Sequence, residues 1–165
     1  MAIRNIRIDG DPILRKRSRE VDRVDERILE LINDMKETMY DADGVGLAAP
    51  QVGTLRRVVV VDVGEGMHVF INPEILQDEG EEIAVEGCLS IPGFNGTVAR
   101  PLKLTLKFMD ESGEDQTLEA EGFFARAICH EIDHLNGVLF KDIFIEEIRP
   151  EDLEEDSPEA EGEQL

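Results

Sequence analysis

Cysteine is scarce in this sequence of 165 residues, which contains only Cys88 and Cys129. Two cysteines cannot form the several cross-links of a disulfide-stabilised secreted domain. Each thiol is therefore a candidate metal ligand, a candidate nucleophile or a small buried apolar side chain, and the last of these is the usual role of a cysteine.

Long apolar runs are also missing from the sequence. No stretch of about 20 apolar residues is present to span a bilayer, and the opening MAIRNIRIDGDP lacks the apolar stretch of a secretory signal. We therefore expect a cytoplasmic protein that does not associate with a membrane.

Basic residues are few, since 17 Lys and Arg face 38 Asp and Glu and give a formal net charge of −21. Nucleic acids and anionic membranes attract basic surfaces, so this balance argues against both as partners.

The acidity is strongest in residues 151–165, which carry no basic and no aromatic side chain. This composition predicts a disordered or solvated tail. We expect it to follow one globular domain over residues 1–150.

The periodicity of apolar residues predicts two helices and four strands. Helical spacing over residues 25–41, with Asp25 near the N-cap, and again over residues 122–136 indicates amphipathic helices. Runs of β-branched or alternating apolar residues predict two hairpins. Their strands are expected at residues 57–63 with 67–71, and at residues 98–108 with 116–120.

The second predicted helix contains the sequence HEIDH, with His130 and His134 at positions i and i+4. Their imidazoles lie roughly 40° apart around the helix axis and can bind one metal ion. Glu131 lies roughly 100° from His130, where it can take a proton from metal-bound water as the general base of HExxH hydrolases does. Because acidic helices produce this spacing by chance, a solvated face of His and Glu side chains is the alternative.

A catalytic zinc-like site takes three protein ligands and leaves a fourth position for water, so a third ligand is needed. Cys129 points roughly 100° away from His130 around the helix. Cys88 lies in a different segment, EGCLS, where Gly87 allows the loop to fold over a metal. We therefore expect Cys88 as the third ligand. The alternative is that Cys88 is a nucleophile paired with a histidine.

Three segments together resemble the peptide deformylase family. Residues 44–51 match its GxGLAAxQ motif, residues 86–90 its EGCLS motif and residues 130–134 its HExxH motif, in the expected order. The similarity covers roughly residues 6–145, including the DPIL start and the HLNGVLF continuation. Three ordered motifs are much stronger evidence than a single one.

The resemblance implies a compact single-domain α+β fold, with antiparallel β-sheets around a central HExxH helix. It also implies removal of the N-formyl group from the N-terminal methionine of newly synthesised proteins, with release of formate. The implied site consists of the metal ligands Cys88, His130 and His134, the general acid/base Glu131, and two oxyanion donors, Gln51 and the backbone N–H of Leu89.

One divalent metal ion per chain is expected. Thiolate and imidazole ligands suit both Fe²⁺ and Zn²⁺, and the resemblance favours Fe²⁺ in cells. The implied partners are N-formyl-methionyl nascent polypeptides. Some relatives approach the ribosome with a basic C-terminal extension, whereas residues 151–165 would be repelled by RNA phosphate. We therefore expect neither ribosome docking by that route nor direct binding of nucleic acid.

A formyl-methionine side chain requires an apolar slot, and Val45, Phe123 and Ala127 are the candidates to line it. Ordinary core packing explains such residues equally well. Gly46 is a candidate for the close approach of substrate backbone, because it has no Cβ, and the alternative is a simple turn glycine.

Glu86 and Arg100 are candidates for an ion pair that fixes the cysteine loop, as in similar proteins.

Cys129 stands where many family members have glutamine. Two rival functions are another HExxH metallopeptidase, which would cleave internal peptide bonds, and a non-enzymatic metal-binding module with a closed four-ligand site that includes Cys129.

Overall fold

Two antiparallel sheets and two α-helices make up the fold in the computed structural model, which describes residues 2–149, 151–152 and 165. The five-stranded sheet has the order β1-β2-β3-β6-β7 and the three-stranded sheet the order β4-β5-β8. In chain order the elements are η1 (Pro12–Arg15), α1 (Glu26–Asp41), β1 (Gly46–Ala48), η2 (Ala49–Val52), β2 (Val58–Val61), β3 (His68–Glu79), β4 (Glu82–Cys88), β5 (Ile91–Arg100), β6 (Lys103–Met109), β7 (Asp115–Glu121), α2 (Gly122–Leu135), η3 (Phe140–Asp142) and β8 (Glu147–Ile148).

Helix α1 begins where its capping residue predicts. The carboxylate of Asp25 accepts a hydrogen bond from the backbone N–H of Ile28 at 3.0 Å, which satisfies one of the free donors of the first turn. The helix buries one face, including Ile32, Met35 and Met39, against strands β1 and β2. The helix expected at residues 25–41 is confirmed to within one residue.

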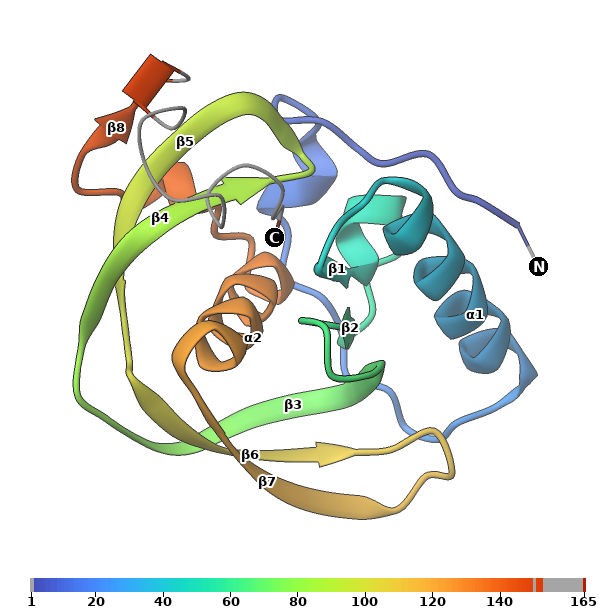
Figure 1. Ribbon diagram of the computed structural model, residues 1–165. Helices are drawn as coiled ribbons and strands as arrows, with labels where there is room; N and C mark the ends of the chain where they lie inside the picture. The colour runs from blue at the N-terminus through green and yellow to red at the C-terminus, as the bar shows by residue number, and fades with distance from the viewer. Residues whose placement is uncertain (1, 150, 153–164) are drawn as a thin grey trace.

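Strand β2 is buried on both faces, which explains why it consists of four consecutive valines. Val58 and Val60 pack in the cluster that includes the apolar face of α1. Val59 and Val61 point the other way, into the cluster that includes Ala127 and Ile128 of α2. Figure 1 shows β1 and β2 between the two helices. The strand therefore joins the two halves of the core.

The predicted hairpins are present, but two strand boundaries are wrong, and the first is that β3 continues to Glu79 instead of ending at residue 71. β2 pairs with β3, and β6 pairs with β7, each in antiparallel register. The strand expected at residues 98–108 is split, because residues 98–100 belong to β5 in the other sheet and β6 begins at Lys103. Pro101 stands between the two strands and has no backbone N–H for a ladder. The alternation of apolar residues continues across this break and conceals it.

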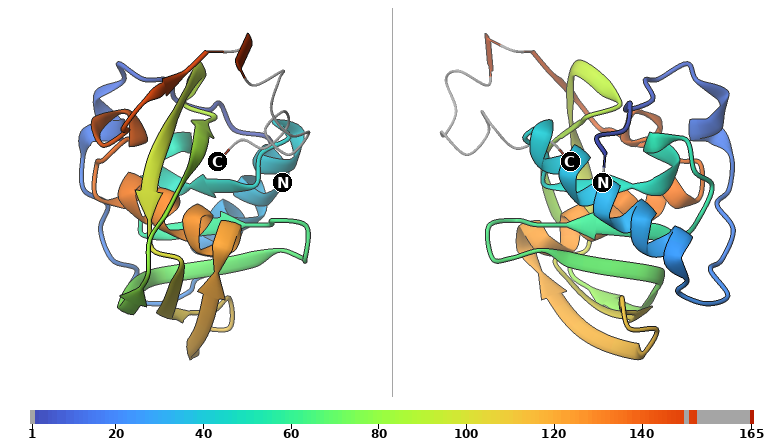
Figure 2. Two further views of the ribbon diagram at one scale, coloured as in Figure 1. Left: turned by 60° about the vertical axis from the view of Figure 1, so that its left-hand side comes forward. Right: turned by 90° about the vertical axis from the view of Figure 1, so that its right-hand side faces the viewer.

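Helix α2 follows β7 without a connecting loop. β7 ends at Glu121 and α2 starts at Gly122, whose φ of +63° is a conformation that favours glycine. The helix contacts strands of both sheets and lies between them (Figures 1 and 2). The helix expected at residues 122–136 and the α+β fold around it are confirmed.

The boundary expected at residue 150 stays a prediction, since residues 153–164 lie outside the described residues. Leu165 is described, and only 1% of its surface is exposed. It packs in the same apolar cluster as Ala127 of α2, which the acidic composition of residues 151–165 does not indicate. Within the described part of the chain, no helix has the length and apolar character needed to cross a membrane.

We expect Met35→Ala to lower the free energy of unfolding by about 2–5 kcal/mol, because truncation leaves a cavity under α1. Met35 is fully buried, whereas Leu29 on the same helix is 39% exposed. Leu29→Ala is therefore the control and should cost under about 1 kcal/mol. Urea denaturation of both variants measures the difference, and equal costs would contradict the assigned core.

Candidate metal centre and active site

Three buried side chains converge beside α2. One donor atom from each of Cys88, His130 and His134 lies within 4.8 Å of the others. The Sγ of Cys88 is 3.4 Å from Nε2 of His134, and the two imidazole centroids are 5.0 Å apart. Cys88 ends strand β4, and the histidines come from successive turns of α2. The structure thus brings together the three residues predicted as ligands.

The carboxylate of Glu86 orients the imidazole of His130, on the side away from its Nε2. It is fully buried and accepts hydrogen bonds from Arg100 at 2.8 and 2.9 Å and from Arg126 at 2.7 Å. Its Oε1 also lies 2.8 Å from Nδ1 of His130. A carboxylate in this position holds the proton on Nδ1 and leaves Nε2 free as a metal ligand. The expected ion pair of Glu86 with Arg100 is confirmed.

Several buried polar atoms of the site have no hydrogen-bond partner and are suited to bind a cation. Among the residues that the structure describes, Nε2 of His130 and both carboxylate oxygens of Glu131 are buried without a hydrogen-bond partner. Buried polar atoms are rarely left unpaired, so such atoms around a thiol indicate a missing ligand. Thiolate and imidazole nitrogen are donors that Fe²⁺ and Zn²⁺ accept. The residues present are therefore suited to the ion that the sequence predicts.

Burial and local charge set the protonation of the site. Burial raises the pKa of Glu131 to about 7. Burial acts in the same direction on Glu86, but hydrogen bonds from Arg100 and His130 outweigh it and hold the pKa of Glu86 well below its usual value. Burial also lowers the pKa of His134, which favours the neutral imidazole that a metal needs.

The two predicted oxyanion donors both come close to Cys88: Gln51 belongs to η2, and Leu89 follows Cys88 in the sequence. Gln51 is fully buried, and its Nε2 lies 3.0 Å from Oγ of Ser90 and 3.8 Å from Sγ of Cys88. Its Oε1 accepts the backbone N–H of Ala48 at 2.9 Å, which fixes the orientation of the amide. The backbone N–H of Leu89 donates to the backbone oxygen of Leu165 at 3.1 Å. Both donors are therefore close to the proposed ligand sulfur.

The predicted slot residues share one apolar cluster. Ala127 is fully buried in it, and Val45 and Phe123 pack against it half-buried. An added Cβ at Gly46 would lie 2.5 Å from Oε2 of Glu131, while the expected approach of substrate backbone at this glycine stays a prediction. The absence of a side chain at Gly46 thus makes room for the predicted general base.

Cys129 is not part of the ligand group found among the described residues. It is 7% exposed and packs in the apolar cluster of α2, and burial raises the pKa of its thiol to about 11. A protonated thiol on this side of the helix is a poor fourth ligand. The closed four-ligand site considered from the sequence therefore has no support.

Three supporting residues were missed by the sequence analysis. Arg126 is 2% exposed and bridges Glu86 to the backbone oxygens of Val98 and Glu82. Its position four residues before His130 puts both on one face of α2, a signal that was available. Asp133 binds Arg100 at 2.7 Å and Ser90 accepts from Gln51, but neither contact follows from a sequence pattern.

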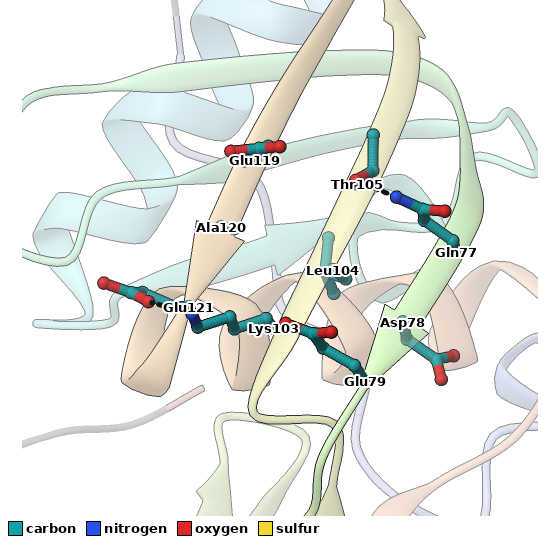
Figure 3. A pocket seen from close by; sticks show the side chains of 9 residues that line it. All are labelled: Gln77, Asp78, Glu79, Lys103, Leu104, Thr105, Glu119, Ala120 and Glu121. Atoms are coloured by element: carbon teal, nitrogen blue, oxygen red, sulfur yellow. Dashed lines mark hydrogen bonds and ion pairs between the residues drawn. The ribbon is translucent and has the colours of Figure 1, made fainter.

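A hollow of about 510 Å³ lies on the five-stranded sheet, away from the Cys88 group. Figure 3 shows the ion pair of Lys103 with Glu121 across β6 and β7, and the hydrogen bond that Gln77 donates to Thr105. Most of its other lining side chains are acidic and exposed. None of the predicted site residues lines this hollow.

A buried thiol and two imidazoles beside an unpaired carboxylate are the arrangement of a metal-dependent hydrolase. The sequence matches the family model described as polypeptide deformylase over residues 3–149. It is 63% identical over 142 residues to peptide deformylase 1 of Clostridium acetobutylicum, covering 86% of this chain and 95% of that one. The chain therefore belongs to the peptide deformylase family, whose enzymes remove N-formyl groups from nascent peptides.

Solved structures agree with this assignment. The crystal structure of peptide deformylase from Thermotoga maritima superposes with a TM-score of 0.85 at 47% identity, over 87% of this chain and 98% of that chain. A peptide deformylase from Ehrlichia chaffeensis in complex with actinonin gives a TM-score of 0.86 at 37% identity, over 88% of this chain and 90% of that chain. Identities this high carry the family as well as the fold.

We expect Glu86→Gln to lower the free energy of unfolding by about 3–5 kcal/mol, because two buried guanidinium groups lose their counter-charge. Metal affinity should fall about 10–100-fold as His130 loses its orienting partner. Glu82→Gln on the same strand is the control, since that carboxylate is 47% exposed and 4.0 Å from Arg126. Denaturation and competitive metal titration measure both effects. Equal behaviour of the two variants would contradict the central role of Glu86.

Proposed function

We propose that this enzyme acts on formyl-methionyl nascent polypeptides in the cytoplasm, with one divalent ion held by Cys88, His130 and His134. The observation that carries the assignment is the convergence of these three buried donors within 4.8 Å. The free Nε2 of His130 and the neutral state favoured at His134 both suit coordination. Fe²⁺ is the ion we assign in cells, and Zn²⁺ is the alternative that the same donors accept.

The bound ion would lower the pKa of a water molecule from 15.7 toward roughly 7 and would polarise the formyl carbonyl. Glu131 then takes a proton from the attacking water molecule while the oxygen of that water bonds to the formyl carbon. The bond between that carbon and the methionine nitrogen breaks, and Glu131 passes the proton to the leaving amine. The products are formate and a free N-terminus.

Gln51 and Leu89 act on the oxygen of the formyl group. As this oxygen gains negative charge, the Nε2–H of Gln51 and the backbone N–H of Leu89 stabilise it, and one such donor is commonly worth roughly 3 kcal/mol of barrier. Gln51 is held in place by Ala48 and Ser90, so little reorganisation is needed during the reaction. These donors therefore contribute more to turnover than to substrate binding.

The methionine side chain of the substrate is assigned to the slot lined by Val45, Phe123 and Ala127. These residues belong to or pack against the apolar cluster beside the ligand histidines. A flexible thioether side chain suits an apolar lining of this kind. Because nascent chains carry the formyl group, the partner is the emerging polypeptide itself. The acidic residues 151–165 are not assigned a role in ribosome docking.

We expect Glu131→Gln to retain one metal ion per chain and to lose about 10²–10⁴-fold in kcat, because the proton carrier is removed while the ligands stay. Protein purified without oxygen, with its metal measured, is assayed for formate release from a formyl-methionyl peptide. His134→Ala is the contrasting variant and should lose the metal itself. Full activity of Glu131→Gln, or an inactive metal-loaded wild type that cleaves internal peptide bonds instead, would contradict the proposal.

Gly46→Ala should lower kcat about 10²-fold with the metal retained, because an added Cβ 2.5 Å from Oε2 displaces the carboxylate of Glu131. Metal content and the kcat for formate release are measured on the same preparation. If the variant kept both metal and wild-type kcat, the carboxylate could move freely and its position would not matter.

A further inference from the structure

Leu165 lies beside the candidate active site although the residues before it in the sequence are strongly acidic. Its backbone N–H donates to the carbonyl oxygen of Gly87 at 3.3 Å, and its own backbone oxygen accepts the N–H of Leu89 at 3.1 Å. Gly87 and Leu89 flank Cys88, the proposed ligand. Leu165 is therefore bound to the end of β4 as a short added strand would be. Figure 1 shows the end marked C near β4 and α2.

The side chain of Leu165 is buried in the apolar cluster that contains Ala127. Val45 and Phe123 pack against the same cluster. These three residues are the ones assigned to the methionine side chain of the substrate. Leucine and methionine have similar volumes and both are apolar, so a slot that fits one accepts the other.

The backbone contact involves a second element of the proposed substrate site. The N–H of Leu89 is the donor assigned to the formyl oxygen, and in the structure it donates to Leu165 instead. A single backbone N–H cannot donate well to two oxygens at once. Occupation by Leu165 and occupation by substrate are therefore mutually exclusive at this donor.

We infer that Leu165 is an internal ligand of the active site, which competes with the formylated N-terminus of the substrate and must leave before substrate binds. This inference rests on the proposed function, because it uses the roles assigned to Leu89 and to the apolar slot. An internal competitor raises the apparent KM by the inverse of the fraction of molecules that it leaves free. It leaves kcat unchanged, because saturating substrate displaces it.

The kinetic test compares Leu165→Glu with Leu76→Glu in the metal-loaded enzyme. Leu76 lies on β3 and is 51% exposed, so it is a matched leucine outside the site. If Leu165 occupies between half and nine-tenths of molecules, Leu165→Glu lowers KM about 2–10-fold at constant kcat. Leu76→Glu leaves both constants unchanged. Unchanged KM in Leu165→Glu would overturn the inference.

A second measurement does not depend on activity. In the zinc-loaded protein, the amide hydrogen of Leu89 should exchange slowly in wild type and at least about 2-fold faster in Leu165→Glu, because its acceptor is lost. Leu76→Glu should match wild type. A peptide of the sequence EGEQL, which copies residues 161–165, should inhibit Leu165→Glu competitively, whereas EGEQE should not.

The two measurements separate this inference from the proposed function. A wild type without deformylase activity, in which Leu165→Glu still speeds exchange at Leu89, would overturn the proposed function and the competition with substrate, while the contact itself would stand. An active wild type, in which Leu165→Glu changes neither KM nor the exchange of Leu89, would overturn the inference alone.

Discussion

The buried carboxylate of Glu86 is the interaction on which the site depends. It lies on β4, accepts from Arg100 on β5, and contacts both Arg126 and His130 on α2, so one side chain ties the smaller sheet to the central helix. A charge buried without partners would cost several kcal/mol, and here two guanidinium groups and an imidazole supply them. The same contacts place Cys88, two residues further along β4, opposite the histidines. Stability of the interface and orientation of the ligands therefore have a common cause.

The helices, the β2 strand and the spacing of the two histidines could be predicted from the sequence, because each depends on residues close together in the chain. The spacing of His130 and His134 follows from helical geometry, and the valines of β2 and the Asp25 cap of α1 indicated their elements. The spacing of Arg126 and His130 indicated a shared face of α2 but not the partner Glu86, and the contacts of Asp133 and Ser90 join segments far apart in the chain, which no periodic pattern encodes. The division between β5 and β6 was missed for a related reason. Apolar alternation reports which face of a strand is buried, but not which sheet the strand joins.

The residues around Glu131 show how the fold accommodates an unpaired buried acid. Burial raises its pKa to about 7 even though the charges of His130 and Arg100 oppose the shift, and neither carboxylate oxygen has a hydrogen-bond partner among the described residues. The neighbouring Gly46 leaves the carboxylate space, and the side chain of Glu131 is fully buried from bulk solvent. An unpaired buried acid of this kind is characteristic of places where chemistry is carried out. A side chain with hydrogen-bond partners on every oxygen would be cheaper to bury and would have no free lone pair to offer.

The direct junction of β7 and α2 constrains how the length of this chain can vary. With no spacer between Glu121 and Gly122, each residue inserted there would turn the whole helix by about 100° and advance it by about 1.5 Å. His130, His134 and Arg126 would rotate together away from Cys88 and Glu86. Length changes are consequently confined to places such as the Asp110–Gly113 turn, which lies at the far end of the same hairpin. The distance in sequence from the start of α2 to its ligands is thus as strictly determined as the identity of the ligands.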